Sequence, residues 1–389
     1  MTPSSHPDEL LLLVGPLPPP VNGQSSAFAM LVEGARARGI PCCVVDLAGE
    51  GGGNNVSWRR VFDHVGILTD FLRRAAVGRK TVYLTIGQFR AGFLRDMVLI
   101  ACSSLFRHRI VCHLHGGNYD GFYASQPAWL QRLIRVTLLR ADRILILGEK
   151  LTAMFEFEPR LRTKLEVVPN GLPYSIAPLG PKELPPEGEP IRILFLSNLI
   201  ESKGYLDLLD AIGLLVEDWR LNVVGHFCGL FIRNPSDDVR VKNVDQARDL
   251  FEGFVRAHRL ERQVRYRGLV TGADKEAELR AAHFLVLPTW YNCEGQPLSI
   301  IEAMAHGCVV IATDYRAIPD LVEDRITGRL VPDRDPRAIA AAIAELAAEP
   351  KRYRDLSEAA LRRFQRRFTR EAHLDRILPL LCETEIRKH

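Results

Sequence analysis

Residues 283–311 read HFLVLPTWYNCEGQPLSIIEAMAHGCVVI and contain two apolar runs separated by a polar loop and a helical segment. The run 284–287 is typical of a buried strand, and the run 308–311 reads as the next strand. Between them, Pro297 has the fixed φ and missing N–H that suit the first position of a helix, which we expect over 298–305. The stretch therefore predicts a strand–loop–helix–strand unit of an α/β sheet.

The loop and helix of this stretch together suggest an anion site. The first residues of a helix have N–H groups without intrahelical partners and lie at the positive end of the helix dipole. Glu294 lies in the loop before the helix, and Glu302 lies inside the helix. A phosphate at the helix N-terminus, with carboxylates accepting from hydroxyl groups, would form a pocket for a nucleotide sugar. Taken alone, two glutamates at this spacing are more often ordinary surface carboxylates.

The length and composition indicate two globular domains. A chain of 389 residues exceeds what one core usually holds, so two domains of about 180 residues are expected. Residues 1–180 carry 20 Lys/Arg against 14 Asp/Glu, and the remainder carries 31 against 33. The basic first half would suit a membrane surface or an anionic acceptor, and it fits ordinary solvated arginines as well. No segment has the density of basic residues typical of a nucleic-acid-binding protein.

The cysteines and the N-terminus favour a cytoplasmic protein. The eight cysteines show no CxxC motif and no regular framework, which is typical of free thiols in a reducing compartment. Residues 1–8 lack the pattern of a signal peptide, and no apolar run reaches about 18 residues. We expect a cytoplasmic location, with peripheral contact to the cytoplasmic face of the membrane as an option.

Strand-like and helical segments alternate along the chain, which predicts parallel sheets covered on both faces. Expected strands are 9–14, 41–46, 81–85, 109–114, 143–147, 191–196, 220–225 and 263–267. Expected helices are 25–38, 57–75, 91–106, 127–140, 205–217, 247–259 and 273–281. The Pro- and Gly-rich residues 173–190 have no periodicity and read as a linker.

One expected helix allows two interpretations. Residues 89–109, FRAGFLRDMVLIACSSLFRHR, are apolar with arginines at both ends. A core helix would have this composition. An interfacial segment whose arginines reach lipid headgroups would have it too, and the core helix is the favoured interpretation.

The segment EGQPLSIIEAMAHGCVVIAT resembles the signature of retaining family 4 glycosyltransferases of the GT-B fold. The resemblance covers nearly the whole chain and is concentrated in residues 191–331. It implies an α/β architecture of two Rossmann-like, doubly wound domains facing across a cleft. The expected division is an acceptor-side domain over 1–172, a linker over 173–190, a nucleotide-sugar donor domain over 191–369, and a C-terminal helix over 370–389 that could pack back on the first domain.

The resemblance also implies roles for two residues of the first domain. Gly23, in the loop GPLPPPVNGQS, would lie near the donor diphosphate or the acceptor, with Asn22 replacing the usual first glycine. An ordinary strand–helix turn is the alternative. His115, directly after the strand 109–114, would face the donor sugar. His113 is expected to be packed, and no nearby Cys, Asp or Glu completes a metal site.

The loop SNLIESKG departs from the family pattern GRxxxxKG at one position. Lys203 and Gly204 match the pattern, whereas Asn198 stands in place of the usual arginine. The Arg–Lys clamp on the donor diphosphate would then lack one cation, because Asn donates hydrogen bonds without carrying a charge. Lys203 near a helix N-terminus opposes the helix dipole, and that misfit favours an anionic partner.

The function implied by the resemblance is retaining transfer of a sugar from a nucleoside-diphosphate sugar to a glycan or lipid-linked acceptor in cell-surface polysaccharide or lipopolysaccharide biosynthesis. Lys203 and the N–H groups of Leu298 and Ser299 would stabilise the leaving diphosphate. Glu302 would bind the ribose and Glu294 the sugar. The other expected donor contacts are Asn198, Gly295 and Gln296. We expect no cofactor and no metal requirement.

Other functions stay open at this point. A retaining glycosidase would need two carboxyls flanking the scissile bond, which the expected roles of the two glutamates do not fit. An epimerase or phosphorylase of the same fold is a second enzymatic option, although no cofactor lysine for a phosphorylase can be located. The non-enzymatic alternative is a catalytically degenerate nucleotide-sugar-binding or membrane-docked scaffold, which the Asn198 substitution would favour.

Overall fold

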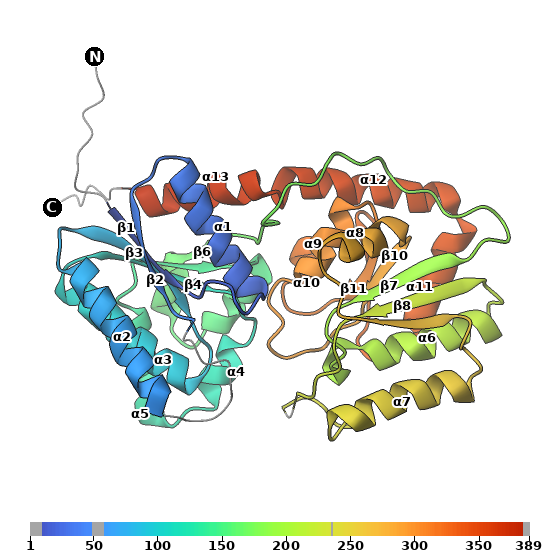
Figure 1. Ribbon diagram of the computed structural model, residues 1–389, viewed down its shortest axis with the longest axis horizontal. Coiled ribbons are helices and arrows are strands. Elements are labelled where there is room, and N and C mark those ends of the chain that lie inside the picture. The colour runs from blue at the N-terminus through green and yellow to red at the C-terminus, as the bar shows by residue number, and fades with distance from the viewer. Residues whose placement is uncertain (1–9, 49–57, 235, 384–389) are drawn as a thin grey trace, which may run out of the picture. The chain divides into compact units, whose positions relative to one another are not determined.

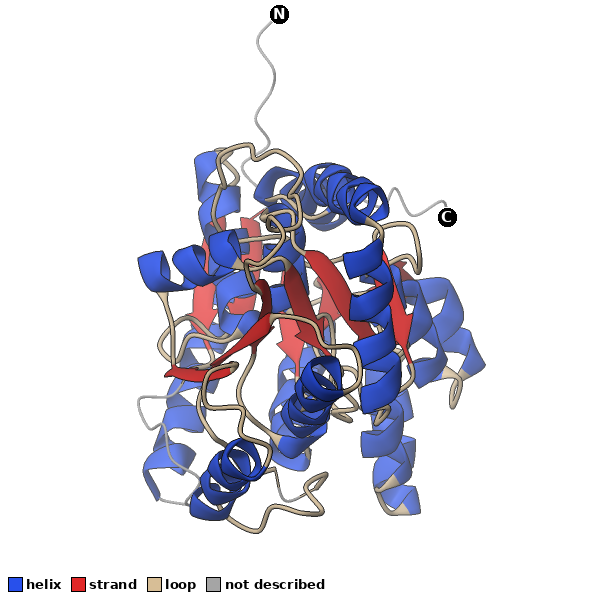
Figure 2. Ribbon diagram, turned by 90° about the vertical axis from the view of Figure 1, so that its right-hand side faces the viewer, coloured by secondary structure: helices blue, strands red, loops and turns tan. Residues whose placement is uncertain are grey.

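The structure, a computed structural model, describes residues 10–48, 58–234 and 236–383, and divides into two compact units. The first unit comprises the residues up to Ser175 together with those from Thr369 onward, and the second comprises Ile176–Phe368. Each unit holds one six-stranded parallel sheet with helices on both of its faces (Figures 1 and 2). Two doubly wound α/β units are the fold class that the sequence predicts.

The sheet of the first unit has the order β2-β1-β3-β4-β5-β6. Its strands are β1 (Leu10–Gly15), β2 (Cys42–Asp46), β3 (Lys80–Ile86), β4 (Arg109–Leu114), β5 (Arg143–Ile146) and β6 (Leu165–Val167). One face is covered by helices α2 (Trp58–Ala75), α3 (Arg90–Leu105) and α5 (Ala128–Leu138). Helix α3 contacts both α2 and α5. The short helix α4 (Tyr119–Ala124) and the 3-10 helices η1 (Glu149–Phe155) and η2 (Pro159–Lys164) complete the connections.

The opposite face of this sheet is covered by helices from the two ends of the chain. Helix α1 (Gly23–Ala37) contacts α13 (Arg370–Cys382), and the two lie side by side in Figure 1. The apolar side of α13 enters the same buried cluster as β1, β3 and α1, through the side chains of Leu374, Ile377, Leu378 and Leu381. The hydrophobic core of the first unit therefore includes residues separated by more than 300 positions in the sequence.

The sheet of the second unit has the order β12-β11-β10-β7-β8-β9. Its strands are β7 (Ile191–Leu196), β8 (Val223–Cys228), β9 (Val264–Gly268), β10 (Phe284–Leu287), β11 (Val309–Thr313) and β12 (Gly328–Val331). Helices α6 (Tyr205–Glu217), α7 (Val244–Ala257) and α11 (Pro336–Ala348) cover one face. Helices α8 (Gly272–Ala281), α9 (Leu298–Ala305) and α12 (Pro350–Arg367) cover the other, and η3 (Glu201–Lys203) and α10 (Ile318–Leu321) are short.

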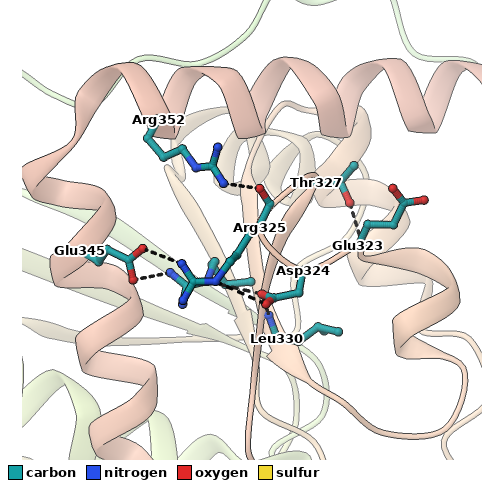
Figure 3. Close-up of polar contacts among 8 residues, drawn as sticks. Glu323, Asp324, Arg325, Thr327, Leu330, Glu345 and Arg352 are labelled. Atoms are coloured by element: carbon teal, nitrogen blue, oxygen red, sulfur yellow. Dashed lines mark hydrogen bonds and ion pairs between the residues drawn. The ribbon is translucent and has the colours of Figure 1, made fainter.

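A polar cluster fixes the turn that leads into β12 (Figure 3). The Glu323 N–H donates to Thr327 Oγ1 at 2.9 Å, and the Leu330 N–H donates to Asp324 Oδ1 at 2.9 Å. Arg329 Nη1 reaches Glu345 Oε2 on α11 at 2.6 Å. The second bond ties the turn to β12, and the third ties β12, the edge strand beside β11, to helix α11.

Most expected elements lie within three residues of their predicted ends, and the strands 109–114 and 191–196 match in full. The expected strand 220–225 is displaced, because Arg220 adopts φ 53 and delays the start of β8 to Val223. The short helices α4, η1, η2 and α10 were not predicted. Residues 1–8 lie outside the described residues, and no described helix is long and apolar enough to cross a membrane.

Candidate active site

A buried ion pair lies where β7 and β10 end. Lys203 Nζ is 2.6 Å from Glu294 Oε2, with the two side chains 13% and 6% exposed. The hydroxyl of Thr289 donates to the same carboxylate oxygen at 3.0 Å. Lys203 Nζ also lies 4.6 Å from the centroid of the Tyr291 ring, which adds a cation–π contact. The structure thus joins two residues that are 91 positions apart and that the sequence selected separately.

A close approach of two loops explains the position of Lys203. Gly204, the next residue, has φ 80, and a Cβ atom there would lie 2.2 Å from the carbonyl oxygen of Pro288. Trp290 N–H donates to the Ser202 carbonyl at 2.8 Å across the same contact. Only glycine allows the loop after β7 to pack this tightly against the end of β10. The glycine therefore brings Lys203 within reach of Glu294.

The carboxylate of Glu201 anchors the other side of this loop. Its Oε2 accepts from the backbone N–H groups of three consecutive residues, Val239, Arg240 and Val241, at 3.0, 2.8 and 3.1 Å. Arg240 Nε adds a charged contact to Oε1 at 3.1 Å. Because the Glu201 side chain is only 3% exposed, these bonds compensate its lost hydration and fix η3, the short helix that ends at Lys203.

Helix α9 begins beside Glu294 without a side-chain cap. The sequence predicts Pro297 at the first helical position, whereas in the structure Pro297 is the N-cap and Leu298 is the first helical residue. Pro297 makes no side-chain hydrogen bond to the helix. Leu298 and Ser299 are the first two helical residues and are half-buried, whereas Gly295 and Gln296 are buried in the preceding loop. The first turn of α9 therefore has backbone N–H groups available for an anion.

Glu302 is paired with a lysine that sequence reasoning missed. Glu302 Oε1 on α9 lies 2.6 Å from Lys275 Nζ on α8, with the side chains 9% and 27% exposed. Lys275 lies in the first turn of α8, and in the sequence it looks like any surface lysine of a polar helix. Only the packing of α8 next to α9 distinguishes it, so the sequence carried no signal for this contact.

Asn198 lies in the loop after β7 and faces the loop after β8. Its side chain is exposed, and Oδ1 accepts weakly from the Leu230 N–H at 3.4 Å in the loop after β8. A Cβ atom on Gly229 would lie 3.0 Å from the Asn198 Cα, so these two loops pack closely. Asn198 therefore contacts the loop after β8.

In the first unit, Asn22 and Gly23 form the start of α1. Asn22 is the N-cap, its Oδ1 accepts from the Ser25 N–H at 3.0 Å, and Ser25 Oγ accepts from the Asn22 N–H at 3.0 Å. This reciprocal capping box gives Asn22 a structural role in place of the glycine expected there. Gly23 is the first residue of the helix, after the carboxyl end of β1.

His115 follows β4 at the same edge of this sheet. Its ring packs against that of His113, with centroids 4.1 Å apart and the ring planes tilted by 36°. None of the described residues forms a hydrogen bond with either ring nitrogen of His115. Burial, with a smaller effect of His373, lowers the pKa of His115 to about 3. His113 is fully buried, and its Nδ1 lies 2.8 Å from the Tyr83 hydroxyl. His113 is thus packed, as expected, and His115 is neutral at physiological pH.

The comparisons with known proteins cover the second unit most directly. Residues 190–349 match the model of the family Glycosyl transferases group 1. The second unit is a group 1 glycosyltransferase domain. The Lys203–Glu294 and Lys275–Glu302 pairs both lie inside the matched residues of this glycosyltransferase domain.

Curated relatives match part of the chain. A putative colanic acid biosynthesis glycosyltransferase of Escherichia coli, WcaL, is 27% identical over 191 residues, which are 46% of this chain and 43% of that protein. The phosphatidyl-myo-inositol mannosyltransferase of Mycobacterium tuberculosis is 33% identical over 159 residues, 39% of this chain and 36% of that protein. The chain thus spans less than half the length of these relatives.

Solved structures match the whole fold at low identity. A glycosyltransferase from Rickettsia africae has a TM-score of 0.70 and 14% identity, with 97% of this chain and 98% of that chain covered. Anabaena HepE, solved in complex with UDP, has a TM-score of 0.67 and 16% identity, with 95% and 99% covered. The glycosyltransferase domain and the first unit together therefore have the GT-B fold that the sequence resemblance implied.

Proposed function

We propose that the chain is a retaining glycosyltransferase that moves a sugar from a nucleoside-diphosphate sugar to a glycan or lipid-linked acceptor. The observation that carries the proposal is the Lys203–Glu294 pair at 2.6 Å, beside the uncapped first turn of α9. A cation, a carboxylate and a helix N-terminus converge there at the carboxyl end of a parallel sheet, where ligands collect in open α/β folds.

Lys203 is the residue to which we assign the leaving diphosphate. Its ammonium group and the N–H groups of Leu298 and Ser299 would stabilise the negative charge that grows as the sugar–phosphate bond breaks. The acceptor hydroxyl would attack the same face of the sugar that the diphosphate leaves, and a departing phosphate oxygen would take the acceptor proton. No protein base is required for that proton transfer.

Donor binding must rearrange the ion pair. Diphosphate oxygens would compete with the Glu294 carboxylate for Lys203, and the freed carboxylate would accept from hydroxyls of the sugar. Thr289 Oγ1 donates to Glu294 at 3.0 Å and would keep the carboxylate in place during the exchange. We assign Thr289 a positioning role for this reason.

Glu302 is assigned to the ribose hydroxyls of the donor. Its ion pair with Lys275 holds the carboxylate in one orientation and adds a positive charge near α9. Gly295 and Gln296, in the buried loop before α9, and Asn198 are proposed as further donor contacts. His115 is proposed to contact the sugar from the first unit, and Gly23 to line the donor or acceptor site. Because the pKa of His115 is about 3, it would act there as a neutral hydrogen-bonding group.

We propose that no metal ion is needed. The cationic side chain of Lys203 and the N–H groups of α9 would supply the charge that a metal supplies in other transferases. Donor turnover should therefore be unchanged after dialysis against a chelator, and a loss restored by a divalent ion would contradict this part of the proposal.

The relatives' names support a proposal for the class of acceptor. WcaL is named for colanic acid biosynthesis, and the mycobacterial relative is named for a phosphatidyl-inositol acceptor. By extension, we propose that the acceptor of this chain is a polysaccharide or a lipid-linked glycan. The transfer would take place in the cytoplasm and would contribute to the synthesis of cell-surface glycans.

The first test identifies the donor. The purified chain is mixed with UDP, GDP, ADP and their sugar conjugates, and the unfolding midpoint is measured, since a ligand that binds only the folded state raises it. A rise of the unfolding midpoint with the nucleotides of one base alone would identify the nucleotide of the donor. NMR of the sugar released on slow donor hydrolysis should then show the anomer of the donor, and the opposite anomer as first product would contradict retention.

Variants of the ion pair test the assigned roles. Lys203→Ala and Glu294→Gln should each lower turnover by about 100-fold or more, the loss typical of removing one preorganised electrostatic contact. Lys242→Ala, an exposed lysine of the same unit, is the matched control and should keep full activity. Near-normal turnover in either site variant would contradict the role assigned to the substituted residue. Donor binding without any turnover in the unmodified chain would instead favour a degenerate scaffold.

A further inference from the structure

Helix α3 has an apolar stripe on its exposed side. The residues that face solvent at helical spacing are Ala91, Leu94, Val98, Ala101 and Leu105. Leu94 is 45% exposed and Leu105 is 79% exposed. The opposite side of α3 packs on the sheet through Phe93, Leu99 and Ile100. A helix on the surface of a globular unit normally exposes polar residues on this side. The buried side of α3 fits the core helix favoured from the sequence, and the exposed apolar stripe is unusual for a surface helix.

The neighbouring helix α5 continues this surface. α5 contacts α3, and its exposed side carries apolar and basic side chains. They include Trp129, which is 66% exposed, Arg132, and Val136, which is 46% exposed, and the exposed Arg140 follows the helix. We call this surface the α3–α5 face, and it consists of Phe89, Arg90, Leu94, Val98, Leu105, Phe106, Arg107, Trp129, Arg132, Val136 and Arg140.

The charges on the α3–α5 face have one sign. Asp96 is the only acidic residue in α3 and α5; it is 2% exposed and paired with Arg95 at 2.8 Å. The exposed charged side chains of these helices are therefore arginines. A second copy of the chain would place like charges against each other in a symmetric contact, which opposes dimerisation through this face.

We propose that the α3–α5 face docks the first unit onto a bilayer that contains anionic lipids. Arginines attracted to anionic headgroups, a tryptophan at the boundary and leucines that enter the acyl region are the combination that interfacial helices use. The phosphates of the lipid headgroups complement the arginines, and the exposed stripe of α3 supplies apolar area. The inference uses only side chains of the first unit and does not depend on the donor chemistry proposed above.

The test measures how much of the full-length chain sediments with vesicles. The chain should bind vesicles made of phosphatidylcholine and phosphatidylglycerol. It should not bind vesicles made only of phosphatidylcholine. Binding should weaken as the salt concentration rises, because exposed charges are screened. Replacing Arg132 and Arg140 together by Ala should weaken binding by about thirtyfold, the combined contribution of two arginines near an anionic surface.

The apolar stripe is tested separately. Leu94→Ser combined with Leu105→Ser should also lower vesicle binding by at least about tenfold, since two leucines no longer transfer into the bilayer. The matched control is Val239→Ser combined with Ile326→Ser, which changes two exposed apolar side chains of the second unit. The control pair should bind like the unmodified chain. All variants change exposed side chains and should keep their unfolding midpoints.

Trp129 reports whether the face enters the lipid. Lipids with brominated acyl chains should quench part of the tryptophan fluorescence of the bound chain. Trp129→Phe should remove that quenching while most of the binding remains. The same variant should leave donor hydrolysis in the absence of vesicles unchanged, so a failure of the proposed chemistry would show in a different assay.

Three results would overturn the inference. One is failure to bind the anionic vesicles, or equal binding to both vesicle types. Another is equal loss of binding in the control pair of the second unit. The third is concentration-dependent self-association that Leu94→Ser with Leu105→Ser abolishes, which would assign the face to a second copy of the chain.

Discussion

Asp207, in the first turn of α6, is a buried acidic residue. It is 6% exposed, its Oδ1 lies 3.8 Å from Arg240 Nη2, and no described residue forms a hydrogen bond with its Oδ2. Burial raises the pKa of Asp207 to about 6, and Arg240 counters only part of this effect. Because the folded-state pKa exceeds the unfolded value of 3.8, the ionised carboxylate destabilises the fold above about pH 6, and the cost disappears as the pH falls toward 4.

Replacing Asp207 by Asn should therefore stabilise the second unit at pH 8 by up to about 3 kcal/mol and have little effect near pH 4. Urea unfolding followed through the fluorescence of Trp219 and Trp290 would measure the difference. Asp249→Asn, at an exposed position of α7, is the control and should show no such gain. A gain of the same size at both pH values would contradict the assignment.

At the scale of single residues, the sequence selected candidate site residues but not the contacts between them. Glu294 and Lys203 were selected separately from two motifs, and the structure joins them directly. Lys275 could not be selected, because its contact with Glu302 depends on how α8 and α9 pack and no local pattern encodes that. Asn22 was interpreted only as a departure from a glycine, whereas it closes a capping box with Ser25.

Individual elements were predictable where hydrophobic pattern and turn residues agree. The helix 298–305 matches α9, since an apolar run is bounded by Pro297 and by Gly307, which has φ 71. The helices η1 and η2 were missed because 3-10 segments of six or seven residues have no 3.6-residue periodicity to detect. The sequence does not predict the contact between the loops after β7 and β10, because the two loops are far apart along the chain.

That contact between loops makes a prediction for Gly204. Gly204→Ala should destabilise the second unit and lower donor turnover, because the added Cβ would lie 2.2 Å from the Pro288 carbonyl oxygen and displace Lys203. The control is Gly213→Ala inside α6, where a Cβ atom meets nothing within 4 Å. That change should stabilise the unit by about 1 kcal/mol, the helix preference of Ala over Gly. Thermal unfolding and donor hydrolysis, measured on both variants, would decide; equal behaviour would refute the steric role.

For the whole molecule, the length of the chain predicts two units. The sequence also allows the C-terminal helix to pack on the first domain. The structure groups the residues from Thr369 onward with the first unit, where α13 contacts α1 and β3. No local pattern in 370–389 specifies that destination, because an amphipathic helix can cover any apolar face of suitable size.

The packing of α13 predicts unequal effects within one helix. Ile377 is fully buried in the core of the first unit, so Ile377→Ala should destabilise that unit by about 2–5 kcal/mol. Asp375 lies on the exposed side and pairs with Arg38 at 2.7 Å. Asp375→Ala should cost at most about 1 kcal/mol, as exposed ion pairs do. Urea unfolding followed through Trp129 would report the first unit, and similar losses in the two variants would contradict this packing.

The discontinuous first unit also sets an order of events during protein synthesis. β1 leaves the ribosome before the second unit is made, yet the side chains that complete the core around β1 belong to α13 and emerge after the second unit. Residues 176–368 are continuous in sequence, so the second unit has all of its strands and helices before the first unit can close. Nascent chains stalled before α13 should therefore protect the second unit from protease while the earlier-made first unit stays open to cleavage.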